Sequence, residues 1–463
     1  MTCFEGVSAL IPGHYLDVKF QSAPGGAADL RDRTYWEMDF PDEGQEDFGP
    51  DQDRLLEEYE SVLLRSVERR LRADVPVVAY SSGGLDSSML VAMARHLRGE
   101  PLDTFTFRIE HPTLDESAEA ATVARHVGNE PTVVDCRPED IIGAFPRLVR
   151  AAESPVIDTS AAALFMLAEA VHARGHKVAL TGEGADEWQA GYPWFRIDKK
   201  LSLLDLIPGL PLSQWGFWFY VRWTGSRRFR RSTILRSQQA AAGHNAWLNV
   251  YNLMSVSKIR FFSEAMSRSM GDYLPYDDLQ MNLERMRRWH PMNRSLYFGA
   301  RIHLAGLHLN ARGDRSAMHS SVETRYPFLD EELFSFLARL HPRWKLRGHR
   351  DKYLQRLLAD RWLPPELTAG RKRLLHAPLD AFHRATPPPF VEQLLSDESL
   401  RKTGYFNPRA VHAWRQRFPR MRHGFRRLFV EMGLVGVIST QLWHHTYIDG
   451  SLADLPSAST TAN

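Results

Sequence analysis

The stretch that decides the fold reads PVVAYSSGGLDSS and occupies residues 76–88. Its first five residues, ending at Tyr80, predict a buried strand that stops abruptly in a loop of serines and glycines. A helix is predicted from Ser87 to Leu97. The adjacent glycines allow backbone N–H groups to approach an anion closely, and the start of the helix adds a positive dipole. The stretch therefore predicts a phosphate-binding loop between a strand and a helix.

Asp86 narrows the kind of phosphate site. A carboxylate beside bound phosphates repels them unless a divalent cation lies between, so the loop predicts a nucleotide bound together with Mg²⁺. The lysine of the G-x-x-x-x-G-K-[ST] loop is absent here, as is the G-x-G-x-x-G spacing of dinucleotide-binding turns. Taken alone, the loop is also compatible with an ordinary glycine turn between a strand and a helix.

Beyond the loop, short apolar runs alternate with helical patterns, which predicts an α/β fold with a doubly wound parallel sheet. The predicted strands cover residues 76–80, 104–109, 131–134 and 177–181. The predicted helices cover residues 87–97, 116–127 and 160–173. Ligands of such sheets bind at the carboxyl ends of the strands, so the loop lies where a ligand is expected.

The fourth predicted strand runs into a second turn, TGEGADE, at residues 181–187. In a parallel sheet this turn lies at the same edge as the first loop, so Asp86 and Asp186 are expected to share Mg²⁺ ions at the ATP phosphates. On its own, the turn is also typical of an acidic helix N-terminus after glycines.

Composition excludes several classes of protein. The 463 residues carry a formal net charge of +2, which gives no reason to expect nucleic acid or a membrane surface as a partner. Only two cysteines, Cys3 and Cys136, are present, which excludes a disulfide framework and favours a reducing, cytoplasmic location. The apolar stretch at residues 215–221 is too short to span a bilayer.

A third motif, DRSAMHSSVETRYPFLD, occupies residues 314–330. Together with the two turns above, it resembles the synthetase domain of the asparagine synthetase family, which carries S-G-G-x-D-S, S-G-E-G-x-D-E and D-R-x-x-M-x-x-S-x-E-x-R-x-P-F-L-D in this order. Lys352-Tyr353-Leu354 matches the downstream K-Y-L of the family, whereas Thr181 replaces the first serine of the second motif. The resemblance covers about residues 1–380.

This resemblance implies an α/β fold of the PP-loop ATP pyrophosphatase type, also called adenine nucleotide alpha hydrolase-like. It implies a remnant of a glutaminase-like domain at residues 1–50 and a synthetase domain at 51–380. Within the latter, residues 195–310 are predicted to form a helical insertion, and residues 381–463 a helical C-terminal extension. The implied reaction joins ammonia to a carboxylate, normally aspartate, through an acyl-AMP.

The resemblance also assigns residues to the site. It implies that ATP contacts Ser82, Gly83, Gly84, Leu85, Asp86, Ser87, Phe107, Thr181 and Gly182. Asp86 and Asp186 would hold Mg²⁺, and Asp86 would count as catalytic together with Glu183 and Lys352. Lys352 would balance charge on the leaving pyrophosphate, while Glu183 would lie near the reacting acyl group and steer ammonia or accept its proton.

Glu323 and Arg325 are implied as residues that orient the substrate. A buried ion pair that braces the turn at Pro327 is an equally good interpretation. After residue 373 the family usually continues G-F-G-x-P-L, but residues 374–379 read LLHAPL here. This departure leaves the identity of the carboxylate substrate open. The tryptophan and histidine residues of the helical insertion are a further candidate lining for a substrate pocket.

The N-terminus departs most from the family. Residues 10–16 resemble the last strands of the glutaminase domain, so most of that domain would be missing. Cys3 lacks the C-G-I context of the family nucleophile and is interpreted as an ordinary small residue. Ammonia is therefore expected from solution, from a separate glutaminase, or from a missing N-terminal domain. The sequence leaves a homodimer open as an assembly.

Two alternatives stay open. One is a related ligase that acts on another carboxylate, such as a beta-lactam synthetase or a peptide-macrocyclising enzyme, although beta-lactam synthetases place tyrosine where Glu183 stands. The other is a tRNA-modifying PP-loop protein, but its thiolating members need paired cysteines and lack the motif at residues 314–330. A non-catalytic scaffold is a further alternative, but it would not require all four of Asp86, Glu183, Asp186 and Lys352.

Overall fold

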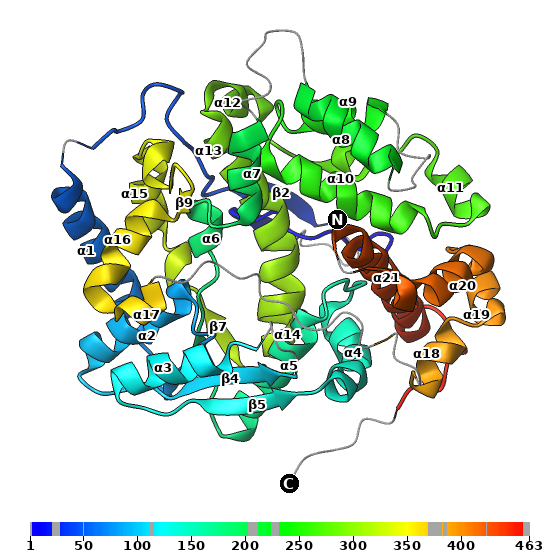
Figure 1. Ribbon diagram of the computed structural model, residues 1–463, viewed down its shortest axis with the longest axis horizontal. Coiled ribbons are helices and arrows are strands. Elements are labelled where there is room, and N and C mark those ends of the chain that lie inside the picture. The colour runs from blue at the N-terminus through cyan, green and yellow to red at the C-terminus, as the bar shows by residue number, and fades with distance from the viewer. Residues whose placement is uncertain are drawn as a thin grey trace.

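The computed structural model describes residues 2–20, 28–49, 51–110, 115–201, 212–223, 231–368, 382, 387–422 and 424–456. A five-stranded parallel sheet in the order β5-β4-β3-β6-β7 lies in the lower part of the molecule as drawn in Figure 1. Its strands are β3 (Val77–Tyr80), β4 (Thr104–Ile109), β5 (Thr132–Cys136), β6 (Val178–Leu180) and β7 (Glu323–Arg325). The predicted α/β class with a parallel sheet is confirmed.

Helices cover both faces of the sheet. Successive residues of a strand point to opposite sides, so the apolar residues on each face need a cover of their own. In β3, Val77 and Ala79 join one hydrophobic core while Val78 joins the other. The first core includes α1 (Gln52–Leu71), α2 (Leu85–Arg98), α3 (Ser117–Val127) and α16 (Tyr353–Trp362). The second includes α4 (Pro138–Ala152), α5 (Ser160–Ala173) and α14 (Arg315–His319).

Four of the five strands were predicted to within two residues at each end, but β7 and α4 were not predicted. The three residues of β7 contain no apolar run, and the strand joins the sheet only by pairing with β6, where Leu180 lies opposite Arg325. For α4 the sequence does carry a start signal, because Pro138 occupies the first turn of the helix.

Helices fill the described parts of the predicted insertion and form much of the upper part of Figure 1. They are α7 (Pro193–Leu201), α8 (Leu212–Trp223), α9 (Arg231–Ala240), α10 (Ala246–Ile259), α11 (Glu264–Met270), α12 (Leu283–Arg288) and α13 (Pro291–Gly299). Two π-helical segments, η3 (Ala300–His308) and η4 (Asn310–Asp314), follow and lead back to the sheet. π-Helical turns are rare in proteins, and those that occur often lie at functional sites.

The C-terminal helices share a core with the sheet. They are α17 (Pro365–Thr368), α18 (Pro389–Leu394), α19 (Asp397–Thr403), α20 (Pro408–Arg417) and α21 (Phe425–Tyr447). Leu434 and Ile438 of α21 belong to the same buried cluster as α4 and α5. The backbone N–H of Val156 donates to the Ser439 hydroxyl at 2.5 Å. No helix among the described residues is both long and apolar enough to cross a membrane.

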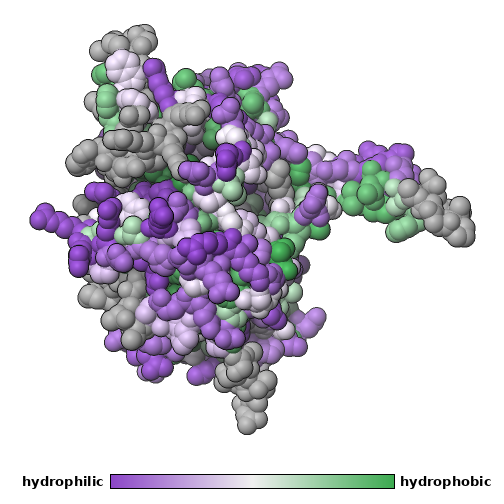
Figure 2. Space-filling view, turned by 90° about the vertical axis from the view of Figure 1, so that its right-hand side faces the viewer, coloured by the Kyte–Doolittle hydropathy of each residue, from purple (hydrophilic) through white to green (hydrophobic). Residues whose placement is uncertain are grey.

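Near the N-terminus, β1 (His14–Lys19) and β2 (Asp29–Thr34) form an antiparallel hairpin with few buried residues. The hairpin projects as an arm, and Figure 2 shows apolar side chains gathered on it. Phe20 and Leu30 are among the exposed apolar residues of this region. After β2 the chain runs alongside α15 (Glu331–Arg339). There Phe40 packs into the core against Phe334 of that helix.

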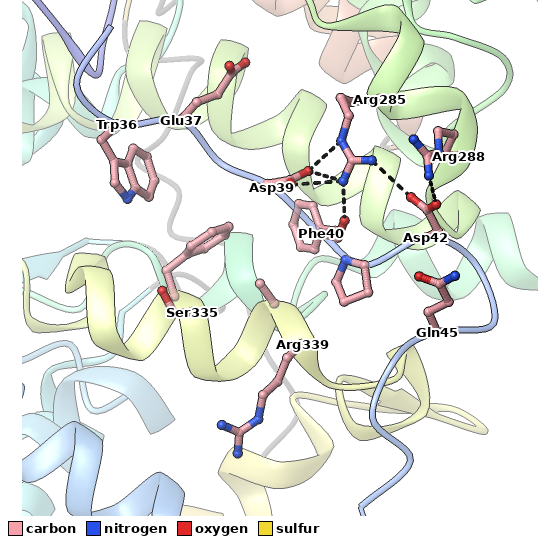
Figure 3. A pocket seen from close by; sticks show the side chains of 13 residues that line it. Trp36, Glu37, Asp39, Phe40, Asp42, Gln45, Arg285, Arg288, Ser335 and Arg339 are labelled. Carbon is pink, nitrogen blue, oxygen red and sulfur yellow. Dashed lines mark hydrogen bonds and ion pairs between the residues drawn. The ribbon is translucent and has the colours of Figure 1, made fainter.

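Ion pairs hold this N-terminal segment in place. Figure 3 shows Arg285 between Asp39 and Asp42, with Arg288 beside Asp42. A hollow of about 500 Å³ lies between this segment, α12 and α15. Its main charged side chains are already paired with one another, and none of the predicted site residues lines it. This hollow is therefore part of how the N-terminal segment packs.

Candidate active site

A cavity of about 1080 Å³ opens where β3, β4 and β6 end and extends to α7, α10, η3 and α21. Every residue predicted for ATP, Mg²⁺ or catalysis lines it: Ser82, Gly83, Gly84, Leu85, Asp86, Ser87, Phe107, Thr181, Gly182, Glu183, Asp186 and Lys352. The two predicted substrate residues, Glu323 and Arg325, do not line it. We call the end formed by the strands the near half, and the end formed by helices the far half.

The loop after β3 is built for close approach. Gly83 has a φ of +73°, and a Cβ there would lie 2.4 Å from the Cβ of Glu119 on α3. Only glycine fits that position. The hydroxyl of Ser87 accepts from the backbone N–H of Ser82 at 3.2 Å, and the hydroxyl of Ser88 donates to the carbonyl of Gly84. The helix α2 begins at Leu85, two residues before the predicted start, so the loop opens directly onto a helix N-terminus.

Lys352 joins the first two predicted motifs. Its Nζ lies 2.6 and 2.5 Å from the two carboxylate oxygens of Asp86, and 2.5 Å from Oδ1 of Asp186. The lysine side chain is 2% exposed. Gln355 donates a further hydrogen bond to Asp86 at 2.9 Å. One buried cation therefore lies between two carboxylates at the carboxyl end of the sheet.

Local backbone conformation places this lysine. Lys352 follows the short hairpin of β8 (Leu346–Arg347) and β9 (Arg350–Asp351) and precedes α16. Its φ of 47° and ψ of 41° are left-handed, a strained conformation for a residue other than glycine. Gly191 leaves room for it, since a Cβ there would lie 1.9 Å from Oδ1 of Asp186 and 2.3 Å from Cε of Lys352.

Asp86, Asp186 and Lys352 also determine whether Mg²⁺ could bind at this end of the sheet. In proteins Mg²⁺ is usually bound by one or two carboxylates together with substrate phosphates. Asp86 and Asp186 supply two carboxylates that already converge on a positive group, the ammonium of Lys352. No cluster of three or more His, Cys, Asp or Glu suited to a metal occurs within the described part of the chain. The residues fit a cation bound jointly with phosphates.

Other predicted residues surround this centre. The Phe107 ring is 9% exposed and lines the near half. The hydroxyls of Tyr80 and Thr181 are buried and have no hydrogen-bond partner among the described residues, so both are candidate contacts for a ligand. Burial raises the pKa of the Tyr80 hydroxyl, and the neighbouring charge of Glu183 raises it further. Tyr80 is therefore a neutral hydroxyl beside Glu183.

Sequence reasoning missed the polar residues that join the two halves. The carboxylate of Glu187 accepts hydrogen bonds from the Tyr192 hydroxyl at 2.5 Å and from the backbone N–H of Gly184 at 3.0 Å. Burial raises the pKa of Glu187 to about 7, and the charge of Asp186 adds to the shift. His308 of η3 lies 3.8 Å from the same carboxylate.

The π-helical segment continues this polar network. Nε2 of His308 lies 3.1 Å from Nε2 of His303, and Nδ1 of His303 lies 3.1 Å from the Tyr251 hydroxyl. Burial lowers the pKa of His303 to about 3, so its ring is neutral and one of the two histidines donates to the other. Arg312 pairs with Asp158 at 3.4 Å. The Trp and His residues of the insertion were an open candidate for a pocket, and His303 and His308 do line the cavity.

Charge in the cavity is strongly unbalanced. Three lysine or arginine side chains line it among the described residues: Arg312, Lys352 and Arg356. Nine carboxylic acids of the described ranges line it: Asp86, Glu116, Glu119, Asp158, Glu183, Asp186, Glu187, Asp198 and Glu366. Such a surface attracts cations and repels anions that arrive without them.

Glu323 and Arg325 occupy the edge strand β7 instead. Nε of Arg325 donates to the Glu323 carboxylate at 2.7 Å, and its Nη1 donates to the carbonyls of Arg70 and Arg72 at the end of α1. These contacts match the alternative interpretation, an ion pair that braces the structure, although Glu323 is exposed rather than buried. The departure from the family at residues 374–379 lies outside the described residues.

Comparison with known proteins gives the family. The sequence model of the asparagine synthase family matches residues 58–445. The matched residues run from α1 to near the end of α21, and the domain boundary at residue 380 stays a prediction.

Individual relatives are distant. The chain is 28% identical over 434 residues to amidase chyE of Penicillium rubens, which covers 87% of this chain and 63% of that protein. It is 26% identical to amidase chry2 of Gibberella zeae, over 89% of this chain and 64% of that protein. With glutamine-hydrolysing asparagine synthetase 1 of Bacillus subtilis it shares 27% identity, over 77% of this chain and 54% of that protein. The chain thus spans less than two thirds of the length of these relatives.

Proposed function

The chain belongs to the asparagine synthase family, and from this premise we propose that it is an ATP-dependent ligase that converts a carboxylic acid into an amide. The observation that carries the proposal is the cluster of Asp86, Asp186 and Lys352 beside a glycine loop at the carboxyl end of a parallel sheet. This arrangement suits a nucleotide whose phosphates lie on the loop.

The proposed reaction has two steps. An oxygen of the substrate carboxylate attacks the α-phosphorus of ATP, the bond to the bridging oxygen breaks, and pyrophosphate leaves. Ammonia then attacks the acyl carbon, and AMP leaves with the former carboxylate oxygen. The amide keeps the other oxygen, and a base accepts the surplus proton of the nitrogen.

The lining residues divide this work. Lys352 would stay beside the leaving pyrophosphate, where a buried point charge offsets the charge that develops. Mg²⁺ held by Asp86 and Asp186 would supply further positive charge at the phosphates. Glu183 would accept the proton from the attacking ammonia, with Tyr80 beside it as a neutral donor. Phe107 would contact the adenine base.

Isotope transfer tests the proposal directly. The protein is incubated with Mg²⁺, ATP, ammonia and an ¹⁸O-labelled carboxylic acid, and the products are separated. We expect AMP and pyrophosphate, with one ¹⁸O atom in the AMP. Formation of ADP, or label in inorganic phosphate, would contradict an acyl-AMP.

Aspartate is the first acid to supply, because the Bacillus subtilis relative is named an asparagine synthetase. Asparagine would then be the product. Replacing ammonia by glutamine in a parallel reaction tests the nitrogen source. We expect ammonia to be used and glutamine to give little product, because we assign no glutaminase nucleophile in this chain. A separate glutaminase would be the partner that supplies ammonia.

A further inference from the structure

The far half of the cavity has a largely apolar wall built from two helices that are distant in sequence. From α10 come Val250, Leu253 and Met254, and from α21 come Leu428, Phe429 and Met432. These side chains are all partly buried. Binding of an apolar ligand to this wall is favoured by about 25 cal/mol for each Å² of apolar surface that the ligand and the wall remove from water.

Aspartate fits this half poorly. When one of its carboxylates reacts, the other still needs a positive partner, because a buried unpaired carboxylate is costly. Each Lys or Arg that lines the cavity among the described residues already has a carboxylate partner: Lys352 contacts Asp86 and Asp186, and Arg312 pairs with Asp158. Arg356 pairs with Asp351 at 2.7 Å.

The border between the halves also offers a polar contact beside aromatic rings. The Trp194 ring stacks on Tyr192 with centroids 4.4 Å apart and an interplanar angle of 8°. Both rings line the cavity, and the buried Trp194 Nε1 donor has no hydrogen-bond partner within the part of the chain that the structure describes. This border can hold a flat apolar group and donate a single hydrogen bond to it.

We propose that the far half binds the body of a monocarboxylic acid that is aromatic or otherwise apolar, and that this acid is the substrate in place of aspartate. The inference rests on the proposed ligase function. In this arrangement the single carboxylate of the acid lies toward Lys352 and Glu183, while its body lies between α10 and α21.

Exchange of labelled pyrophosphate into ATP tests the acid class, since it reports acyl-AMP formation without ammonia. The full chain is assayed with Mg²⁺, ATP and either 3-phenylpropanoate, octanoate, succinate or aspartate. We expect kcat/KM for the two apolar acids to exceed that for aspartate at least about 10-fold. A preference for aspartate or succinate would overturn this inference and leave the ligase function standing. Exchange with none of these acids, together with no acid-dependent AMP from any acid, would overturn the ligase function itself.

A substitution that fills part of the far half gives a second test. Leu253→Trp places a larger side chain in the far half, and we expect kcat/KM for the preferred apolar acid to fall about 10-fold while the KM for ATP stays unchanged. The matched control is Leu235→Trp, the same substitution at a 46% exposed residue of α9 outside the cavity lining. Leu253→Ala serves as a second variant, with thermal unfolding of each protein measured beside it. Equal kinetics for all three variants and the unmodified chain would contradict the inference.

Discussion

The near and far halves of the cavity differ in how the chain builds them. The near half comes from short turns after parallel strands, where Gly83, Asp86 and Asp186 act through backbone position and fixed charge. The far half comes from α7, α10, η3 and α21, whose lining residues carry no motif. Under the proposed function, the near half would set the reaction and the far half would set the acid.

The strongest test of this division is Lys352→Ala. Loss of the cation leaves Asp86 and Asp186 to repel each other and the phosphates, so we expect AMP formation to fall about a thousand-fold with every acid. Lys200→Ala, at an exposed lysine of α7, is the control and should retain full activity. A loss confined to one acid would show that Lys352 serves acid recognition instead.

Gly191→Ala tests how tightly the near half is packed. The new Cβ would push the Asp186 carboxylate and the Lys352 side chain apart, and a displacement of about 1 Å costs about 100-fold in rate. The control is Gly143→Ala in α4, where a Cβ meets nothing within 4 Å. We measure pyrophosphate exchange and thermal unfolding for both. Unchanged exchange in the Gly191 variant would mean that the contact between Lys352 and Asp186 is dispensable.

His308→Asn tests the far half. Its ring lies 3.1 Å from His303 and lines the cavity, so its loss should let the His303 ring and this wall shift and raise the KM for the acid about 10-fold. The KM for ATP should stay within about two-fold of that of the unmodified chain. His349→Asn, at an exposed residue, is the control. A larger effect on ATP than on the acid would break the division between the halves.

The smallest expected effect comes from Glu187, which lies between the two halves. It concerns how the free energy of unfolding depends on pH. Burial raises its pKa from 4.5 to about 7 in the folded protein. The two states bind the same number of protons below pH 4.5, but between pH 4.5 and 7 the unfolded chain releases its proton first. The folded state therefore loses stability as pH rises through this window.

Urea unfolding at pH 5 and pH 8 measures this loss. Between these pH values the unmodified protein should lose more stability than Glu187→Gln, by on the order of 1 kcal/mol. Equal pH dependence of the two proteins would show that Glu187 is ionised in the fold at both pH values.

The sequence predicts the near half well because each of its motifs is local. A strand, a glycine turn and a carboxylate follow one another within a few residues, so the loop at residues 82–87 and the turn at 181–187 can be read without tertiary contacts. The roles of Glu323 and Arg325 could not be read this way. The resemblance left substrate orientation and a bracing ion pair as equal alternatives, and only the structure shows that both residues lie on the edge strand β7 and that Arg325 contacts the end of α1.

By itself, then, the sequence determined the parallel sheet, the glycine loop after β3 and the asparagine synthase family to which the chain belongs. The tertiary structure alone decided that Lys352 lies between Asp86 and Asp186, and that α10 and α21 form one apolar wall. The physical reason is the distance along the chain over which the two kinds of interaction act. Hydrogen bonds and backbone conformation act between neighbours in the chain, whereas side chains from helices almost 180 residues apart meet only after the core has packed.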